Sequence, residues 1–510
     1  MNAAELLLGP RAQARHAART ALVCEGEAVT YAELAALTAR ASAAYAGLGV
    51  RPGEAVLLLM RDTPQFAAAW LGALRMGAVA IALNNKLSDS EYRHILSDSE
   101  ARLAIVENVF ADARPDLSAE LASAQRLVVA GECRSAKAPD WRRLQEQGRP
   151  AEVFDAAEDW PAFYLYSSGT TGRPKGIVHT HRAVAHSGAA LQLLGVAPGD
   201  KVLATSRFFF AYGLEHALLG PLALGATSII CPDWPDAEAV IRMVGAHAPK
   251  LLFSVPTIYR RLLAEPAERL APFSAIDHCI AAGERLPPQL VHHWQQATGV
   301  ELLNLYGMSE TYCACLLTPP GTSDGMDTGA PLPGVELRLL GADGAPTANG
   351  VPGVLWVKHP AQARGYRKLP ERTLDQFKDG WFCTRDLFVR DERGRLLHQG
   401  RADELVKIAG QWVLPAELEE AAAAVAQVAE AACVAVPDAE GLERLALFVI
   451  PRGDPGDALR AAKEACEQAL PRHKRPKWLR AVDELPRTAT GKVQRFRLRE
   501  LLVLELKPPP

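Results

Sequence analysis

The sequence has no long apolar run, no paired cysteine motif and no strong excess of charge. Without an apolar stretch of membrane-spanning length, we expect no membrane span. The nine cysteines are scattered, and the lack of a CxxC pair or zinc spacing predicts reduced thiols rather than disulfides. A formal net charge of −3 gives no general attraction to nucleic acid or anionic membrane. The N-terminus lacks the basic-then-apolar plan of a signal peptide, so a cytoplasmic location is expected.

The length of the chain and the pattern of its apolar segments predict more than one α/β unit. At 510 residues the chain exceeds the usual size of one domain. Val56–Met60 and Ala78–Ala82 have the short apolar pattern of buried strands, and the Ala-rich segment Gln65–Met76 predicts a helix between them. The same alternation recurs in Lys201–Cys231 and Leu251–Leu303. It predicts mostly parallel sheets with helices on both faces.

The last third of the chain changes character. Short, turn-bounded strands between Ala330 and His398 predict a small β-subdomain. Beyond Asp403, a helix expected to begin at Pro415 and continue to Val428 opens a small α+β domain. The other elements expected there are the strands Ala432–Val436, Leu445–Ile450 and Trp478–Val482 and the helix Ala458–Leu470. The predicted α/β fold thus has a large N-terminal domain, residues 1–402, and a small C-terminal domain, residues 403–510.

The most informative stretch is Tyr166–Gly176, YSSGTTGRPKG, which follows the strand-like segment Ala162–Tyr166. We expect the Gly/Ser/Thr run to leave the strand and form a loop. Its backbone N–H groups, its hydroxyls and the Lys175 ammonium can then bind a phosphate group. The stretch is not a Walker A loop, because Lys175 is followed by glycine rather than by Ser or Thr. A solvated turn is the alternative, and this run alone does not decide between them.

Four later segments settle which family the chain resembles. They are Ala281–Leu286, Asn304–Thr311, Gly380–Asp386 with Gly400–Arg401, and Leu485–Lys492. With Tyr166–Gly176, and in this order, they resemble the adenylate-forming superfamily of acyl-CoA synthetases, luciferases and peptide-synthetase adenylation domains. The resemblance spans roughly residues 25 to 500. Phe208–Leu214 is similar to the acid-pocket stretch of bacterial benzoate–CoA ligases, which points to an aryl acid rather than a long fatty acid.

The resemblance implies a two-step, AMP-forming reaction that uses ATP, Mg²⁺ and CoA. A carboxylate, expected to be benzoate or a substituted benzoate, attacks the α-phosphate of ATP to give an acyl-AMP and diphosphate. The CoA thiol then displaces AMP. The expected partners are these small molecules, with no nucleic acid and no membrane, and a homodimer is left open.

Three alternatives remain open. The first is a stand-alone aryl acid adenylation enzyme that loads a separate carrier protein. The others are a luciferase-like oxygenase and a non-catalytic nucleotide-binding regulator. The joint presence of Lys492 and Glu310 disfavours the regulator.

For ATP, the resemblance implies that Thr170 and Thr171 hold the β- and γ-phosphates, with Ser167 and Ser168 beside them and Lys175 orienting the loop or touching diphosphate. The expected ATP- and AMP-binding set is Ser167, Ser168, Thr170, Thr171, Lys175, Ala282, Gly283, Glu284, Asn304, Tyr306, Gly307, Met308, Ser309, Thr311, Asp386, Arg401 and Lys492. A solvated loop charge is the alternative for Lys175.

Glu310 matches the acidic residue that the family associates with Mg²⁺. One carboxylate is chemically adequate, because Mg²⁺ binds through one or two carboxylates plus phosphate oxygens. The alternative is an ordinary acidic residue at the start of a helix. Tyr306 resembles the aromatic side chain that stacks on adenine, although an aromatic at a strand end is more often part of the core.

Asp386 matches the residue that binds the ribose hydroxyls, and Arg401 matches its basic companion. The sequence departs from the family's usual Thr-Gly-Asp here, because Arg385 stands where glycine is usual. A side chain at this position restricts φ, so the sequence leaves open whether the local turn has the family's usual geometry.

Lys492 matches the lysine that bridges the attacking carboxylate and the α-phosphate, so Lys492, Glu310 and Thr170 are the expected catalytic residues. The resemblance also implies a mobile C-terminal domain with its hinge at Asp403. Rotation would replace Lys492 by the CoA-facing residues Lys407, Ala409 and Gly410 for thioester formation. Asp403 also suits an ordinary turn.

The acid pocket is expected to include Ala211, Tyr212 and Gly213 from the aromatic stretch, with Gly307 and Cys313 from a region where a strand passes into a helix. Tyr212 can offer its ring edge or its hydroxyl to the substrate ring. Many benzoate ligases have a histidine near the position that Cys313 occupies here. The resemblance therefore implies that this chain tolerates a different ring substituent from those ligases. The run Phe208–Phe210 has the alternative of being ordinary core.

Overall fold

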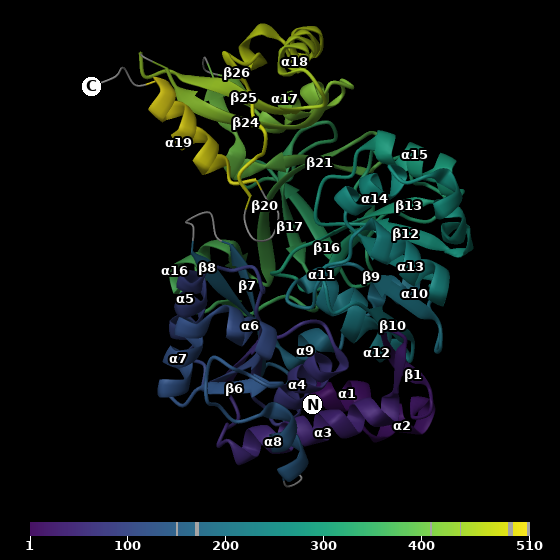
Figure 1. The fold of residues 1–510 in the computed structure, drawn as a ribbon. Helices are drawn as coiled ribbons and strands as arrows, with labels where there is room; N and C mark the ends of the chain where they lie inside the picture. The colour runs from purple at the N-terminus through teal and green to yellow at the C-terminus, as the bar shows by residue number, and fades with distance from the viewer. Residues whose placement is uncertain (149–150, 169–172, 409–410, 439, 488–492, 507–510) are drawn as a thin grey trace. The chain divides into compact units, whose positions relative to one another are not determined.

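The computed structural model describes residues 1–148, 151–168, 173–408, 411–438, 440–487 and 493–506. Contacts within the chain divide it into a larger and a smaller unit. Unit 1 comprises Met1–Arg338, Trp356–Cys383 and Asp391–Leu397, and unit 2 comprises Leu339–Leu355, Thr384–Arg390 and His398–Pro510. The predicted α/β fold with a large and a small domain is confirmed (Figure 1). The boundary between residues 402 and 403 stays a prediction.

The larger sheet of unit 1 has nine strands. In spatial order they are β15 (Ala330–Pro331), β14 (Ala314–Leu317), β13 (Leu302–Gly307), β12 (His278–Ala281), β11 (Leu251–Ser254), β9 (Lys201–Ala204), β10 (Thr227–Ile230), β1 (Thr20–Cys24) and β2 (Glu27–Thr30). The strands from β13 to β1 pair in parallel, whereas β14, β15 and β2 are antiparallel additions. The continuous apolar runs of the parallel strands are typical of a sheet that is buried on both faces.

The second sheet of unit 1 has seven strands. They are β18 (Gly365–Tyr366), β8 (Pro174–Thr180), β7 (Pro161–Ser168), β4 (Val79–Ala82), β3 (Ala55–Leu59), β5 (Leu103–Glu107) and β6 (Leu127–Ala130). Pairing is parallel from β7 to β6, and β8 and β18 are antiparallel. Both sheets therefore have the mostly parallel character that the strand–helix alternation predicted.

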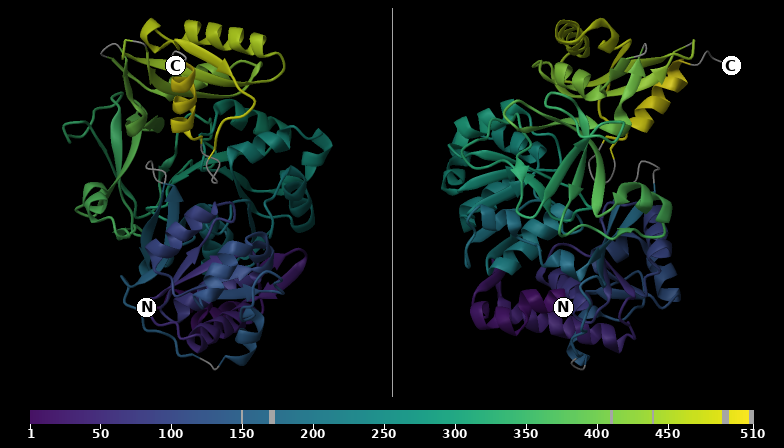
Figure 2. Two further views of the ribbon diagram at one scale, coloured as in Figure 1. Left: turned by 60° about the vertical axis from the view of Figure 1, so that its left-hand side comes forward. Right: turned by 180° about the vertical axis from the view of Figure 1, so that it is seen from behind.

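Helices cover the faces of both sheets. On the nine-stranded sheet lie α13 (Ala237–His247), α14 (Pro256–Leu263) and α15 (Pro288–Thr298), whose apolar side chains share one core with the strands. On the seven-stranded sheet, α5 (Asp89–Ser99), α6 (Asn108–Ala113) and α7 (Pro115–Ser123) share one core with the strands. The helices α3 (Tyr31–Gly47) and α4 (Pro64–Arg75) contribute to the largest core. Figure 2 shows the N-terminal, purple and blue part of unit 1 from two further sides.

The remaining helices of unit 1 are short. They are α1 (Ala3–Leu8), α2 (Pro10–His16), α8 (Trp141–Gln147), α9 (His181–Val184), α10 (Ala189–Leu193), α11 (Ala211–Gly213), the π-helix η1 (Leu214–Leu219), α12 (Gly220–Leu224), the 3₁₀ helix η2 (Ala267–Ala275) and α16 (Pro370–Gln376). A π-helix is rare and is found disproportionately at functional sites, which makes η1 a segment of interest.

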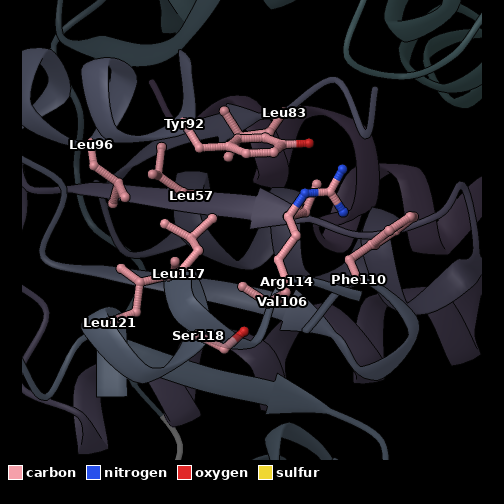
Figure 3. A pocket seen from close by; sticks show the side chains of 12 residues that line it. Leu57, Leu83, Tyr92, Leu96, Val106, Phe110, Arg114, Leu117, Ser118 and Leu121 are labelled. Carbon is pink, nitrogen blue, oxygen red and sulfur yellow. The ribbon is translucent and has the colours of Figure 1, made fainter. Parts of the chain in front are cut away.

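A small apolar cavity of about 20 Å³ lies between α5, α7 and the seven-stranded sheet (Figure 3). Leu57, Leu117 and Leu121 line it, and the Arg114 guanidinium lies 5.2 Å from the ring centre of Tyr92 at its edge. This volume holds about one water molecule, too little for a substrate. None of the lining residues belongs to the predicted site.

A third sheet corresponds to the predicted β-subdomain. Its order is β16 (Glu336–Leu340), β17 (Gly353–Lys358), β20 (Trp381–Arg390) and β19 (Phe377–Lys378), with β21 (Leu396–Arg401) paired to β20. Residues of these strands are assigned to both units, which is why the division of the chain does not follow a single cut in the sequence.

Unit 2 is built on a three-stranded sheet of β24 (Val428–Pro437), β25 (Glu443–Pro451) and β26 (Trp478–Ala481). The helices α17 (Pro415–Ala423) and α18 (Pro455–Ala469) share one core with it, and α19 (Arg495–Leu506) shares another. Shorter elements are the 3₁₀ helices η3 (Ala402–Glu404) and η4 (Arg472–Lys474) and the hairpin of β22 (Val406–Ile408) and β23 (Gln411–Val413). The predicted small α+β domain is therefore present.

Two local predictions in unit 2 need correction. The helix begins at Pro415 as expected, but it ends at Ala423 rather than Val428. Val428 instead begins β24, where it is buried and pairs with Pro451, so sheet pairing overrides the helical propensity of the Ala-rich segment. The helix α19 was not predicted, although Leu498 and Leu502 have the four-residue spacing of its buried stripe.

Among the described residues, no helix combines the length and the apolar character needed to cross a membrane. No disulfide joins any two of the nine cysteines, all of which lie in the described part of the chain.

We expect Gly72→Ala to destabilise the packing of α4 on α3. A Cβ atom at Gly72 would lie 2.7 Å from the Ala41 Cβ and 2.9 Å from the Ser42 nitrogen, so the two helices would have to separate. Overpacking of this kind costs roughly 1–3 kcal/mol, of which the better helix propensity of alanine offsets about 1 kcal/mol. The measurement is the midpoint of urea unfolding, which should fall.

Gly245→Ala in α13 is the matched control. An added Cβ there has no atom within 4 Å, so the variant should be stabilised by up to about 1 kcal/mol. A shift of the same sign in both variants would contradict this account of the α3–α4 contact.

Candidate active site

The two ends of the predicted phosphate-binding stretch lie on paired antiparallel strands. β7 continues through Ser168, and Ser167 and Ser168 pair with Lys175 and Pro174 of β8. The prediction that the Gly/Ser/Thr run leaves the strand at once is therefore wrong, because the antiparallel partner extends the strand by two residues. Thr170 and Thr171 lie outside the described residues. This pairing places Ser167, near the start of the predicted phosphate-binding stretch, opposite Lys175, near its end.

Lys175 forms a buried ion pair with Glu310. The Lys175 Nζ lies 2.8 Å from the Glu310 Oε1, and the two side chains are only 10% and 12% exposed. The hydroxyl of Tyr366, on β18, donates to the same oxygen at 2.8 Å, and the Lys175 Nζ lies 4.0 Å from the centre of the Tyr366 ring. Two expected site residues that lie 135 positions apart in the chain are thus in direct contact.

This contact determines the charge of Glu310. Burial acts to raise the pKa of the carboxyl group, but the Lys175 ammonium and the hydrogen bonds from Lys175 and Tyr366 outweigh burial and lower the pKa. Glu310 is therefore a carboxylate at neutral pH. The role of Tyr366 was not predicted, and no motif in the sequence pointed to it.

Glu310 lies in a tight turn between β13 and β14, not at the start of a helix. β13 and β14 pair antiparallel, so the expected strand-to-helix passage at Gly307–Cys313 is wrong. The alternative in which Glu310 is an ordinary helix-start residue is excluded with it. The buried Thr311 hydroxyl donates to the carbonyl of Cys313 at 2.9 Å, a hydrogen bond that stabilises the reversal. Thr311 thus has a structural partner in the turn.

Buried groups on three sides hold this turn. The Nε2 of His179 lies 2.8 Å from the Ser309 carbonyl oxygen, and the Ala363 amide donates to the Glu310 carbonyl at 2.9 Å. Burial lowers the pKa of His179 to about 4, so the ring is neutral and its Nε2–H donates. Tyr312 has a φ of 59°, a costly conformation for a bulky side chain. The Ser187 hydroxyl, 2.8 Å from the Tyr312 hydroxyl, contacts its far end.

The residues expected around adenine lie at the ends of neighbouring strands. Ala282, Gly283 and Glu284 follow β12, and Asn304 and Tyr306 lie on the adjacent β13, where Asn304 pairs with Ala281. In α/β sheets the carboxyl ends of parallel strands are the usual place for ligands. Gly283 has a φ of 82°, which favours glycine. The Glu284 carboxylate accepts from the Thr257 hydroxyl at 2.7 Å, and Met308 and Ser309 continue into the Glu310 turn.

The expected acid-pocket residues come from two places in the chain. Ala211, Tyr212 and Gly213 form α11, whereas Gly307 ends β13 and Cys313 follows the Glu310 turn. A Cβ atom at Gly213 would lie 2.2 Å from the Arg207 carbonyl oxygen, so only glycine fits there. The Tyr212 hydroxyl donates to the Ser254 carbonyl at 3.1 Å. This bond occupies the hydroxyl, which leaves the ring of Tyr212 as its contact surface.

The Phe208–Phe210 run packs in the hydrophobic core, as its alternative interpretation predicted. Phe208 and Phe209 are buried and belong to the largest core of unit 1, and Phe210 packs against that core. The run therefore anchors the chain immediately before α11.

In unit 2, Arg401 joins two of the predicted residues. Its Nη1 lies 3.2 Å from the Asp386 Oδ1, and its Nε lies 3.1 Å from the Asp403 Oδ1. Burial acts to raise the pKa of Asp403, but Arg401 outweighs it and lowers the pKa. Arg385 has a φ of 61°, so it adopts the left-handed conformation that glycine takes more readily. Arg385 lies within β20, so a strand and not a turn accommodates this conformation.

The expected CoA-facing segment is only partly described. Lys407 pairs with Trp412 across the β22–β23 hairpin, and the Lys407 Nζ lies 5.9 Å from the centre of the Trp412 ring. Ala409, Gly410 and Lys492 lie outside the described residues. Their predicted roles stay predictions.

Comparison with known proteins gives the class of protein. The family described as AMP-binding enzyme matches residues 10–367, and the AMP-binding enzyme C-terminal domain matches residues 417–492. The chain therefore belongs to the AMP-binding enzyme family. This confirms the resemblance to the adenylate-forming superfamily.

Individual relatives narrow the likeness. The chain is 40% identical to a 3-hydroxybenzoate–CoA ligase of Aromatoleum sp. (strain CIB), with 98% of this chain and 97% of that protein covered. It is 36% identical to the benzoate–CoA ligase of Thauera aromatica, with 98% and 95% covered. A crystal structure of an anthranilate CoA ligase in complex with anthranoyl-AMP has a TM-score of 0.90 and 29% identity, with 99% and 98% of the chains covered.

We expect the Lys175–Glu310 pair to be strongly coupled. Lys175→Met leaves the Glu310 carboxylate buried without its cation, a change that costs roughly 3–5 kcal/mol. The double variant Lys175→Met/Glu310→Gln should lose less stability than the sum of the single variants. A double-mutant cycle by urea unfolding measures the difference, which should exceed about 1 kcal/mol.

The pH dependence and a surface pair provide the checks. Because the pKa of Glu310 is lowered from 4.5, the stability it contributes is present above that value and is lost as the pH falls through the folded pKa. The cost of Lys175→Met should therefore shrink in acid.

Arg142 and Glu146, 3.9 Å apart and 86% and 66% exposed, should show a coupling of no more than about 0.5 kcal/mol. Equal coupling for the two pairs would refute the buried-pair account.

Proposed function

We propose that the chain is an ATP-dependent aryl acid–CoA ligase. It converts an aryl carboxylic acid, ATP and CoA to aryl-CoA, AMP and diphosphate through an aryl-AMP intermediate. The observation that carries this proposal is the similarity over nearly the whole length to ligases that activate benzoate and hydroxybenzoate. Membership of the AMP-binding enzyme family supports the AMP-forming route.

The first half-reaction brings two anions together. A carboxylate oxygen of the acid forms a bond to the α-phosphorus of ATP, and the bond from that phosphorus to diphosphate breaks. Positive charge and hydrogen bonds at fixed positions must offset the repulsion between these groups. We assign the diphosphate end to Ser167, Ser168, Thr170, Thr171 and Lys175.

The base and the ribose have separate sites in this proposal. Adenine lies among Ala282, Gly283, Glu284 and Tyr306, at the ends of β12 and β13, and the ribose hydroxyls bind Asp386 with its companion Arg401. The Asp386–Arg401 contact supports the second assignment, because the guanidinium orients the carboxylate that would accept from the ribose.

Glu310 is the residue that would hold Mg²⁺. Its lowered pKa keeps it ionised, and a single carboxylate suits Mg²⁺ when phosphate oxygens complete the coordination. In the described part of the chain, no cluster of three or more His, Cys, Asp or Glu side chains could hold a metal by itself. Metal binding is therefore expected together with the nucleotide. When bound, Mg²⁺ offsets the charge of the phosphates.

The second half-reaction requires a different set of residues. The sulfur of CoA attacks the acyl carbon, the bond to AMP breaks, and the thiol proton passes to solvent. We propose that Lys492 serves the first half-reaction and that Lys407, Ala409 and Gly410 serve the second. The exchange would take place by rotation at Asp403. Asp403 accepts a hydrogen bond from Arg401, so this contact lies at the proposed hinge.

A cytoplasmic location and a homodimer also remain proposals from the sequence. Cell fractionation and light scattering of the purified protein would measure them.

The activity test is a panel of acids with ATP, Mg²⁺ and CoA. Benzoate or a hydroxybenzoate should release AMP and diphosphate and give one thioester for each AMP, whereas long-chain fatty acids should react poorly. Thioester absorbance and AMP release measure the two products. Accumulation of the adenylate with CoA present, or thioester formation only on a carrier protein, would instead support the adenylation enzyme.

Lys492→Ala should separate the half-reactions. We expect adenylation to fall by about 100-fold or more, since an ammonium that stabilises the transition state is lost. Thioester formation from supplied aryl-AMP should fall much less. Lys463→Ala, an exposed lysine of α18, is the matched control and should leave both rates unchanged. Equal losses in both half-reactions would contradict the assignment of Lys492 to adenylation.

A further inference from the structure

Glu215 is a fully buried carboxylic acid for which the site described above has no use. It lies in the π-helix η1, directly after α11, and is 1% exposed. Its Oε2 accepts a hydrogen bond from the Ala314 amide at 3.2 Å. Its Oε1 is buried and has no hydrogen-bond partner among the described residues. A carboxyl kept only for structure would be expected to use both oxygens, because an unsatisfied buried polar group is destabilising.

The surroundings of Glu215 are those of the predicted acid pocket. Ala211, Tyr212 and Gly213 immediately precede η1 in the chain, and the Cys313 thiol lies beside the carboxyl group. Ala314, whose amide holds Oε2, follows Cys313 on β14. The segments that carry Ala211–Gly213 and Cys313 are therefore adjacent to Glu215.

The protonation state suits a hydrogen bond with a neutral ligand. Burial raises the pKa of Glu215 to about 8, and the nearby amides of Ala314 and Gly188 and the Cys313 thiol offset only part of that effect. The neighbouring His216 is also uncharged, because burial lowers its pKa to about 4. Its Nδ1–H donates to the Tyr212 carbonyl at 3.0 Å, and its Nε2 lies 3.7 Å from the Glu215 Oε2. A neutral carboxyl group can both donate and accept.

The rest of the predicted pocket offers little polarity. Ala211, Gly213 and Gly307 have no polar side-chain atoms, and the Tyr212 hydroxyl is bonded to the Ser254 carbonyl. Ligand pockets are mostly apolar, with a few placed polar groups that set specificity. The Oε1 of Glu215, which is buried and has no hydrogen-bond partner among the described residues, can serve as such a group.

We propose that Glu215 is a specificity-determining residue that hydrogen-bonds a ring hydroxyl of the aryl acid, so that the preferred substrate is a hydroxybenzoate rather than benzoate. The inference rests on the proposed ligase function. The name of the 40%-identical relative, a 3-hydroxybenzoate–CoA ligase, agrees with the substrate class. A site built to bond a substrate hydroxyl discriminates against the analogue that lacks it, since the protein group is then left unpaired.

The test compares kcat/KM for benzoate and for 2-, 3- and 4-hydroxybenzoate in the full-length enzyme. We expect at least one hydroxybenzoate to exceed benzoate by about 10-fold or more. Glu215→Leu should reduce that ratio to near one, and Glu215→Gln, which keeps a donor and an acceptor, should retain much of it. A purely structural role would lower both activities and leave the ratio unchanged, so the ratio is the deciding quantity.

Glu107→Gln is the matched control. Glu107 is another carboxylate of unit 1 with a mostly buried side chain, 13% exposed, but it binds Arg61 on the seven-stranded sheet. Its substitution should leave the ratio unchanged. If Glu215→Leu does not fold, a comparison of substrates in the wild-type enzyme still tests the proposal. The fluorobenzoate with fluorine at the position of the preferred hydroxyl group is close in size but cannot donate a hydrogen bond. It should react about 10-fold less well than that hydroxybenzoate.

The outcomes distinguish this inference from the function on which it rests. If no aryl acid forms a thioester, the proposed function fails. If aryl acids react but benzoate and the hydroxybenzoates are used equally, or if Glu215→Leu keeps the wild-type ratio, the assignment of Glu215 is overturned while the ligase function stands.

Discussion

The buried ion pair between Lys175 and Glu310 is the interaction on which the site depends. Lys175 belongs to the seven-stranded sheet and Glu310 follows a strand of the nine-stranded sheet, so their 2.8 Å contact joins the two sheets of unit 1. Tyr366 adds a hydrogen bond from a third segment. Each charge would be costly to bury alone, and each is tolerated because the other is present. The pair therefore connects the two sheets at the site and sets the charge of the proposed metal-binding carboxylate.

The same region carries backbone strain that its neighbours support. Tyr312 has a left-handed backbone conformation two residues after Glu310, and the Ser187 hydroxyl and the edge of Phe163 contact its ring and hydroxyl. His179 holds the preceding carbonyl from the seven-stranded sheet. Strained residues persist where the surrounding structure over-determines them, and they cluster at functional sites. The Glu310 turn is thus positioned by groups from both sheets before any ligand arrives.

Much of the fold and part of the site could be predicted from the sequence. The alternation of apolar strands and Ala-rich helices predicted the parallel sheets, because burial on both faces requires near-continuous apolar runs. The motifs named Lys175 and Glu310 as candidate site residues, but they did not show that the two side chains contact each other. The helix predicted to reach Val428 was too long, because pairing of Val428 in β24 is a contact between segments distant in sequence. Nothing in local sequence revealed Tyr366 or the buried Glu215, whose environments are formed by several segments at once.

By itself, the sequence determined the α/β class, the order of the motifs and the family that they identify, because these depend on residue type and spacing along the chain. Tertiary structure alone decided that the Gly/Ser/Thr stretch begins as a paired hairpin, that Glu310 occupies a turn and not a helix, and that the Tyr212 hydroxyl is already bonded. It also decided that one oxygen of Glu215 is left without a partner among the described residues. The physical reason is that burial and hydrogen-bond satisfaction are set by segments far apart in the chain, which a local pattern does not record.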